Sequence, residues 1–173
     1  MRHRMRAMIL TAFLGVYGAA SAQQANPLDV IPDKMPFATP YGAPISLARA
    51  QAAIAAATAE AEKRDWALNV AVVDSGANLV AFVRMDGALL GSIAISQHKA
   101  RAAVKFRRPT KVFEENIQKN DYKYQLTLDD VIASRGGIPL IEDGKLIGAI
   151  GCSGGAGSQD EAACMVGAAT INK

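Results

Sequence analysis

The segment from His98 to Arg108 combines a histidine with several cationic side chains and is the first candidate for a functional site. The chain has two histidines, and His98 is followed at short helical spacings by Arg101, Lys105 and Arg108. An imidazole is a usual protein ligand for haem iron and for other metal ions. Guanidinium and ammonium groups bind carboxylates. The pattern predicts a site with His98 as metal ligand and the three cations as partners of an acidic ligand's carboxylates.

The residues around His98 predict a helix over residues 91–105, ended by the proline at position 109. On a helical projection, Ile95 and Phe106 share an apolar stripe, flanked by His98 and Lys105. A flat apolar ligand with carboxylates needs this mixture, so Ile95 and Phe106 join the candidate site. The alternative is that His98 is an ordinary histidine at a helix edge, or is hydrogen-bonded at a subunit interface.

The first 22 residues have the pattern of a secretory leader. Three arginines precede an apolar run over residues 8–18, and Ala20-Ser-Ala22 gives the small-x-small pattern that signal peptidase accepts. The run is too short to span a bilayer as a permanent anchor. We therefore expect a signal peptide over 1–22, cleavage before Gln23, and a periplasmic or secreted protein without membrane attachment. A retained N-terminal anchor is the alternative.

Removal of the leader changes the charge of the chain. The leader holds three of the 19 basic residues and none of the 16 acidic ones, so 16 of each remain. A net charge near zero gives no reason to expect a nucleic acid or an anionic membrane as partner. Residues 23–44 contain five prolines and predict an extended N-terminal arm. The remainder, residues 45–173, is long enough for one domain with a hydrophobic core.

The order of the expected elements indicates an α+β protein. An alanine-rich helix is predicted over 47–64, and strand formers predict hairpins over 66–84 and 138–152, the second turning at Asp143-Gly144. Thr110 is expected to cap a short helix ending at residue 119, and Ser158 a last helix ending at 169. Adjacent hairpins make an antiparallel sheet, with helices on one or both of its faces.

The cysteines, the glycine runs and the serines limit which other kinds of site the chain can contain. Cys152 and Cys164 are the two cysteines, and an exported location permits a disulfide, while buried free thiols are the alternative. A structural zinc site would need more ligands than two cysteines and one histidine. The glycines at 136–137 and 154–157 match neither nucleotide-binding pattern and predict tight turns. No Gly-x-Ser-x-Gly motif is present, which disfavours a serine hydrolase.

Three stretches of the chain resemble a known family. Residues 69–88 are similar to the first hairpin of the GlcG/HbpS-like haem-binding family (domain of unknown function 336). Residues 92–110 resemble its central helix, and 136–140 with 143–155 resemble its second hairpin and loop. The resemblance covers residues 45–172 and implies a profilin-like antiparallel sheet, flanked by helices, in a domain that assembles into homo-oligomers. For some members it also implies the binding of haem or a related tetrapyrrole.

The leading hypothesis is an exported haem-binding protein that acts as a carrier, scavenger or sensor partner. His98 is then the iron ligand, and Arg101, Lys105 and Arg108 are the partners of the haem propionates. One alternative is an accessory enzyme of a catabolic pathway, or a protein that binds a small organic acid in the same pocket. Another is a structural oligomer without iron. No catalytic residues are indicated, so binding is favoured over catalysis.

Overall fold

The computed structural model describes residues 26–172, so the predicted signal peptide lies outside the described residues. The chain consists of two compact units, and the boundary between them along the sequence falls between Lys34 and Met35. The described part of the first unit holds a short 3-10 helix, η1 (Pro27–Asp29). The second unit contains the sheet and every other helix of the described residues. Within residues 26–172, no helix is both long and apolar enough to cross a membrane.

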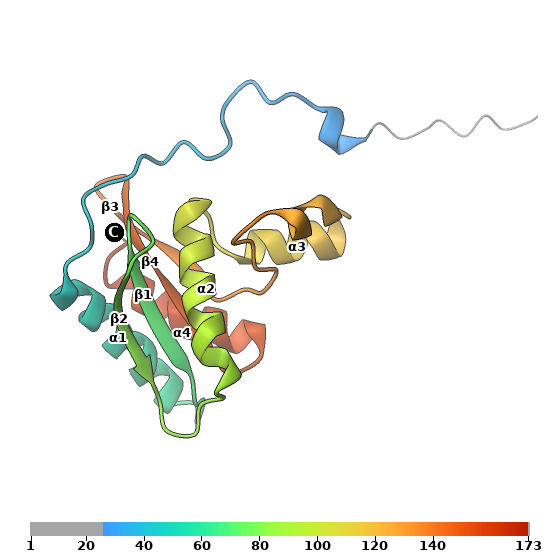
Figure 1. Ribbon diagram of the computed structural model, residues 1–173. Helices are drawn as coiled ribbons and strands as arrows, with labels where there is room; N and C mark the ends of the chain where they lie inside the picture. Colours follow the sequence, from blue (N-terminus) through green and yellow to red (C-terminus); the bar gives the residue numbers. More distant parts are fainter. Residues whose placement is uncertain (1–25, 173) are drawn as a thin grey trace, which may run out of the picture. The chain divides into compact units, whose positions relative to one another are not determined.

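Four antiparallel strands form one sheet in the order β2-β1-β4-β3. The strands are β1 (Asn69–Asp74), β2 (Leu79–Arg84), β3 (Gly137–Glu142) and β4 (Lys145–Ser153) (Figure 1). The two predicted hairpins are β1–β2 and β3–β4, and the pairing of β1 with β4 joins them. The α+β class predicted from the sequence is confirmed.

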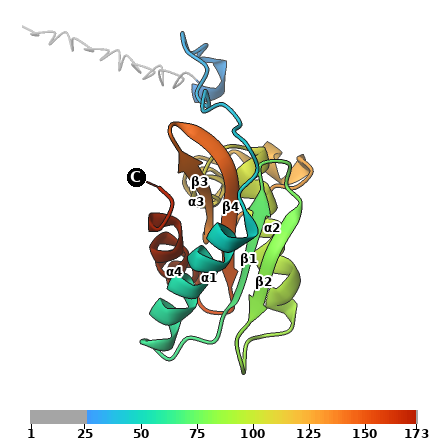
Figure 2. The same ribbon diagram turned by 90° about the vertical axis from the view of Figure 1, so that its left-hand side faces the viewer.

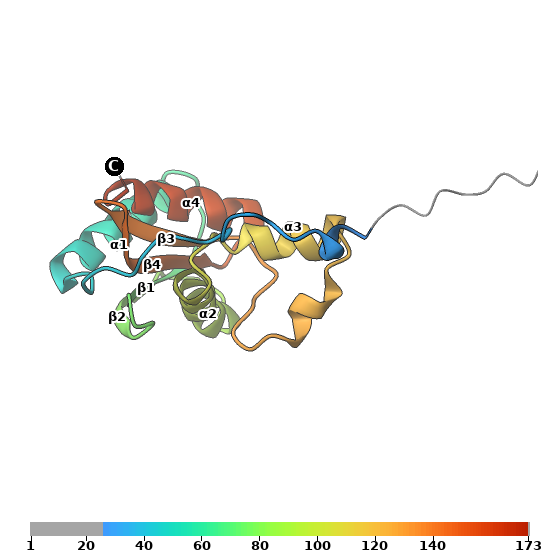
Figure 3. The ribbon, with the colours of Figure 1, turned by 90° about the horizontal axis from the view of Figure 1, so that it is seen from above.

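Helices cover both faces of the sheet. Helices α1 (Leu47–Glu62) and α4 (Gly157–Ala169) pack on one face, and α2 (Gly91–Lys105) packs on the other (Figures 2 and 3). Val70 and Val72 of β1 belong to the core under α1 and α4, whereas Val73 packs in the core under α2. Because β1 is buried on both sides, its sequence is a nearly continuous apolar run.

Helix α2 lies unusually close to the sheet at two glycines. A Cβ atom at Gly151 of β4 would lie 2.1 Å from the carbonyl oxygen of Ser96. A Cβ atom at Gly137 of β3 would lie 2.3 Å from the carbonyl oxygen of Lys99. Any larger residue at these positions would push the helix away, so these glycines determine where α2 and its outward side chains lie.

Thr110 occupies its predicted N-cap position without the capping hydrogen bond, and the predicted cap at Ser158 is wrong. The helix α3 (Lys111–Lys119) follows Thr110, but the Thr110 hydroxyl makes no cap. It accepts a hydrogen bond from the backbone N–H of Gly137 at 2.9 Å, which ties the start of α3 to β3. Ser158 lies inside α4, whose N-cap is Ala156. The backbone N–H of Ala156 donates to the Gln159 side chain at 2.8 Å, so a glutamine of the first turn binds the backbone of the N-cap residue.

The proline-rich arm ends against the sheet. The backbone N–H of Gly42 and that of Ile45 donate to the carbonyl oxygens of Leu146 and Ile147, both in β4, at 2.8 and 2.9 Å. The Tyr41 hydroxyl donates to the carbonyl oxygen of Lys105 at 3.0 Å and so caps the C-terminal end of α2. The end of the arm therefore packs on the domain.

The two cysteines form a disulfide. Cys152 near the end of β4 is bonded to Cys164 of α4, with their Cα atoms 5.7 Å apart. Both side chains are fully buried in the core under α1 and α4. Of the two alternatives that the sequence leaves open, the structure has the disulfide, which fixes α4 to the sheet.

Candidate functional site

His98 lies on α2, beside residues that face the sheet. Its neighbours Lys99 and Ala100 are buried, while the imidazole itself is half-buried. Its Nε2 atom is covered from solvent and has no hydrogen-bond partner among the described residues. A buried polar atom without a partner costs free energy and calls for an explanation. An unpartnered ring nitrogen can serve as a metal ligand once a movement of the imidazole or of its cover exposes it.

Four of the predicted site residues share one face of α2. Ile95, His98, Arg101 and Lys105 follow one another at spacings of three or four residues, which places them along one side of a helix. Ile95 is 39% exposed, and Arg101 is half-buried. We call these four residues the His98 face. The structure therefore brings an apolar side chain, an imidazole and two cations together, as the sequence predicts.

The segment 120–136, which follows α3, reaches the His98 face through Asp130. The Asp130 carboxylate accepts a hydrogen bond from Lys105. This hydrogen bond lowers the pKa of Asp130, and the nearby charges of Lys105 and Arg101 act in the same direction against the opposing effect of burial. Asp130 also has a positive φ of 64°, which is uncommon for a residue other than glycine. The carboxylate thus occupies the position where an acidic ligand would meet Lys105.

Arg108 and Phe106 do not belong to this face. The Arg108 guanidinium lies over the Phe37 ring, 3.1 Å from its centroid, and burial lowers the pKa of Arg108. The Phe106 ring packs edge-on against Phe113 with the centroids 5.1 Å apart. Both predicted site residues thus form an aromatic cluster past the end of α2, and the structure does not place them with His98.

Sequence reasoning missed Asp130 as a partner of the cations. The aspartates at positions 129 and 130 interrupt an apolar pattern. Their charge, opposite to that of the α2 edge, was the available signal. The sequence also gave no reason to single out Lys99, which is 1% exposed and pairs with the buried Asp160 at 2.8 Å. Burial raises the pKa of Asp160, while Lys99 opposes that shift. Because Lys99 is enclosed in the protein, we assign it to the scaffold.

The protein side chains do not assemble a metal site of their own in the described part of the chain. Among residues 26–172, no group of three His, Cys, Asp or Glu side chains is arranged to hold a metal ion. His98 is thus a candidate ligand that belongs to no such group in residues 26–172. One protein ligand is sufficient for a metal that arrives with its own equatorial ligands, as iron does in haem.

The sequence matches a family model described as "Haem degrading protein HbpS-like" over residues 45–169. The chain belongs to the HbpS-like family. The resemblance predicted from the sequence is thereby confirmed. Protein GlcG of Escherichia coli (strain K12) is 39% identical over 109 residues, which are 63% of this chain and 81% of GlcG.

Solved structures agree with this HbpS-like assignment. Klebsiella pneumoniae protein ORFY, a domain of unknown function 336, is 30% identical with a TM-score of 0.70, over 82% of this chain and 97% of ORFY. PduOC, crystallised as a complex with haem, is 30% identical with a TM-score of 0.69, over 75% of this chain and 96% of PduOC. The profilin-like arrangement of sheet and helices is therefore common to this chain and its relatives.

Proposed function

We propose that this HbpS-like protein binds haem, or a related tetrapyrrole, on the His98 face. The observation that carries the proposal is the buried, unpartnered Nε2 atom of His98. Haem supplies an iron that accepts an imidazole nitrogen, which would satisfy this atom. The haem complex of PduOC, a protein of the same fold, supports the choice of ligand.

The other residues of the face suit a ring with carboxylates. Ile95 offers an exposed apolar side chain to a flat ring. Arg101 has no ion-pair partner among the described residues, so its guanidinium is free to bind a propionate. Lys105 would exchange the Asp130 carboxylate for the second propionate. The segment 120–136 must then shift, or the imidazole must turn, to expose the iron ligand.

Haem titration of the purified protein tests the proposal. His98→Ala should weaken haem binding at least tenfold, about 1.4 kcal/mol, with a shifted Soret band because the axial ligand is changed. Gln118→Ala on the exposed side of α3 is the control and should bind as the wild type does. Wild-type protein without haem affinity would refute the proposal. An unchanged band and affinity in His98→Ala would mean that another group holds the iron.

We further propose that the protein is an exported carrier, scavenger or sensor partner. The basic start, apolar run and small-x-small pattern of residues 1–22 support export. Mass spectrometry of the exported protein should find an N-terminus within a few residues of Gln23. An intact Met1 in a membrane fraction would refute cleavage. A Soret band that is stable in time fits a carrier, whereas decay of the band would favour haem degradation.

We also propose a homo-oligomer. Large apolar side chains are exposed around the start of α2, with Leu89 62% and Leu90 70% accessible. Monomeric proteins rarely leave such side chains grouped on the surface. Light scattering at micromolar concentration should therefore give a mass above that of one chain, and a monomer would contradict the proposal.

A further inference from the structure

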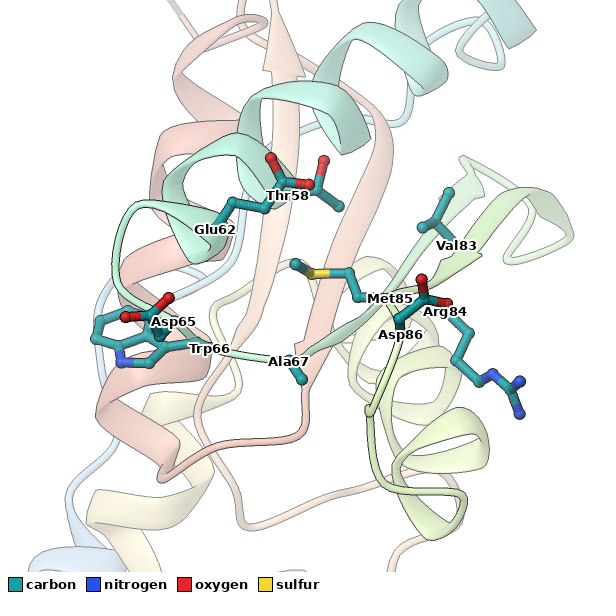
Figure 4. A pocket seen from close by; sticks show the side chains of 9 residues that line it. All are labelled: Thr58, Glu62, Asp65, Trp66, Ala67, Val83, Arg84, Met85 and Asp86. Atoms are coloured by element: carbon teal, nitrogen blue, oxygen red, sulfur yellow. The ribbon is translucent and has the colours of Figure 1, made fainter.

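A hollow of about 610 Å³ opens between the C-terminal end of α1 and the end of β2. The lining residues in Figure 4 lie on the side of the sheet that α1 covers. His98 belongs to α2, which lies on the opposite face of the sheet (Figure 3). Met85 and Trp66 line the hollow and pack against the core beneath it. Its volume is in the range of pockets that hold small molecules.

The hollow is acidic. Glu62, Asp65 and Asp86 contribute three carboxylates, and none of them has an ion-pair partner among residues 26–172. Arg84 is the one cation of the lining, and Figure 4 shows its guanidinium directed away from Glu62 and Met85. The lining therefore favours a cation and disfavours a ligand with carboxylates, such as haem.

Trp66 adds an aromatic surface suited to a cation. An indole ring is the aromatic group that attracts cations most strongly. The Arg64 guanidinium, paired with Glu60 at 2.7 Å, lies over the ring at 5.0 Å from its centroid, so a ligand would contact only the part of the indole that Arg64 leaves open. Met85 is held in place because its sulfur accepts a hydrogen bond from the backbone N–H of Leu68 at 3.5 Å.

An apolar groove continues from the acidic hollow along α1 and β2. A second hollow of about 350 Å³ is lined by Ile54 and Ala55 of α1 and by Ala81 of β2. It shares Thr58 and Val83 with the first hollow, so the two are continuous. A ligand that fills both would have an apolar part beside Ile54 and a charged part beside Glu62.

We propose that this groove binds an amphiphilic organic cation. The apolar chain of the ligand lies between α1 and β2, and its ammonium head lies among Glu62, Asp86 and Trp66. The proposal rests on three matches between ligand and groove: the ammonium group with the carboxylates and with the indole ring, and the apolar chain with the apolar groove. It is independent of the haem proposal, because no residue of the His98 face lines the groove.

Tryptophan fluorescence provides a direct test, since Trp66 is the only tryptophan of the chain. Titration with decyltrimethylammonium below its critical micelle concentration should change the emission of Trp66 with saturation. Tetramethylammonium, which lacks the chain, should bind at least tenfold more weakly. Decyl sulfate, which has the same chain and the opposite charge, should produce no saturable change.

Matched variants separate the carboxylates of the groove from the charge of the whole protein. Glu62→Gln/Asp86→Asn should weaken decyltrimethylammonium binding at least tenfold. Glu115→Gln/Asp121→Asn removes the same charge on and after α3 and should bind as the wild type does. Equal affinity of the two double variants, equal quenching by decyl sulfate, or no saturable change in the wild type would each overturn the proposal.

Discussion

The Lys99 ammonium group lies 2.8 Å from a carboxylate oxygen of Asp160, and both side chains are almost completely buried. Lys99 also donates to the carbonyl oxygen of Cys152 at 3.2 Å, and the second oxygen of Asp160 accepts from the backbone N–H of Gly155 at 3.0 Å. The pair thus connects α2, the end of β4 and the start of α4, and so joins both helical layers through the sheet.

Removal of one member of this ion pair should lower the stability of the protein strongly. Lys99→Met leaves a buried carboxylate without its partner, so we expect unfolding free energy to fall by about 3–5 kcal/mol. Lys99→Met/Asp160→Asn should cost less than the sum of the single changes, because neither charge is then left alone. Chemical denaturation measures both. Lys119→Met, in an exposed pair with Glu115, is the control, and an equally small effect of Lys99→Met would contradict the prediction.

The disulfide should add to the stability of the domain. Reduction of the Cys152–Cys164 bond should lower the unfolding free energy by about 2–4 kcal/mol, because the unfolded chain gains freedom. Thermal unfolding with and without reductant measures the difference. Cys152→Ala/Cys164→Ala should show no response to reductant. Alkylation of both cysteines in denatured, unreduced protein would show that the bond is absent.

A second ion pair predicts a dependence on pH. The carboxylate of Glu114 accepts hydrogen bonds from the Nε and the backbone N–H of Arg135, both at 2.8 Å. Partial burial raises the pKa of Glu114, but these bonds outweigh it and the pKa lies below its ordinary value. The stabilisation is therefore fully present above about pH 4.3, the ordinary value, and is lost as the pH falls through the folded-state pKa.

Melting temperatures measured at several pH values test this pair. Glu114→Gln should melt below the wild type near neutral pH, and the difference should shrink as the pH falls through the lowered folded-state pKa of Glu114, because the wild-type carboxylate is then protonated. Glu62→Gln removes a carboxylate that has no ion-pair partner among the described residues, and it serves as the control. A difference for Glu114→Gln that stays constant with pH would assign its effect to packing.

The sequence predicted the elements well because each has a clear pattern. The strand formers before Asp74 and the Asp143-Gly144 turn give both hairpins, and the bounds of α2 agree with the prediction. What the pattern could not show is how closely α2 approaches the sheet, which depends on Gly137 and Gly151 in strands distant from it in sequence. The burial of Lys99 follows from that approach.

The relative positions of the candidate site residues were predicted correctly only for the residues that lie within one helix. Ile95, His98, Arg101 and Lys105 share a face because the helical period holds over all of them. The same period was applied to Phe106 and Arg108, but α2 ends at Lys105, and Arg107 has a positive φ of 53°. The chain turns there, so residues past this point leave the helical face.

Asp130 gives a last prediction, about access to His98. Its ion pair with Lys105 holds the segment 120–136 against the His98 face. Asp130→Ala removes this ion pair, so His98 should react about two- to fivefold faster with diethyl pyrocarbonate. This factor corresponds to the loss of an exposed ion pair that contributes up to about 1 kcal/mol of free energy. Ultraviolet absorbance follows the reaction in protein lacking residues 1–22, where His98 is the only histidine. Asp129→Ala, at the exposed neighbouring position, is the control. Equal rates in the two variants would mean that Asp130 does not restrict access, whether or not the protein binds haem.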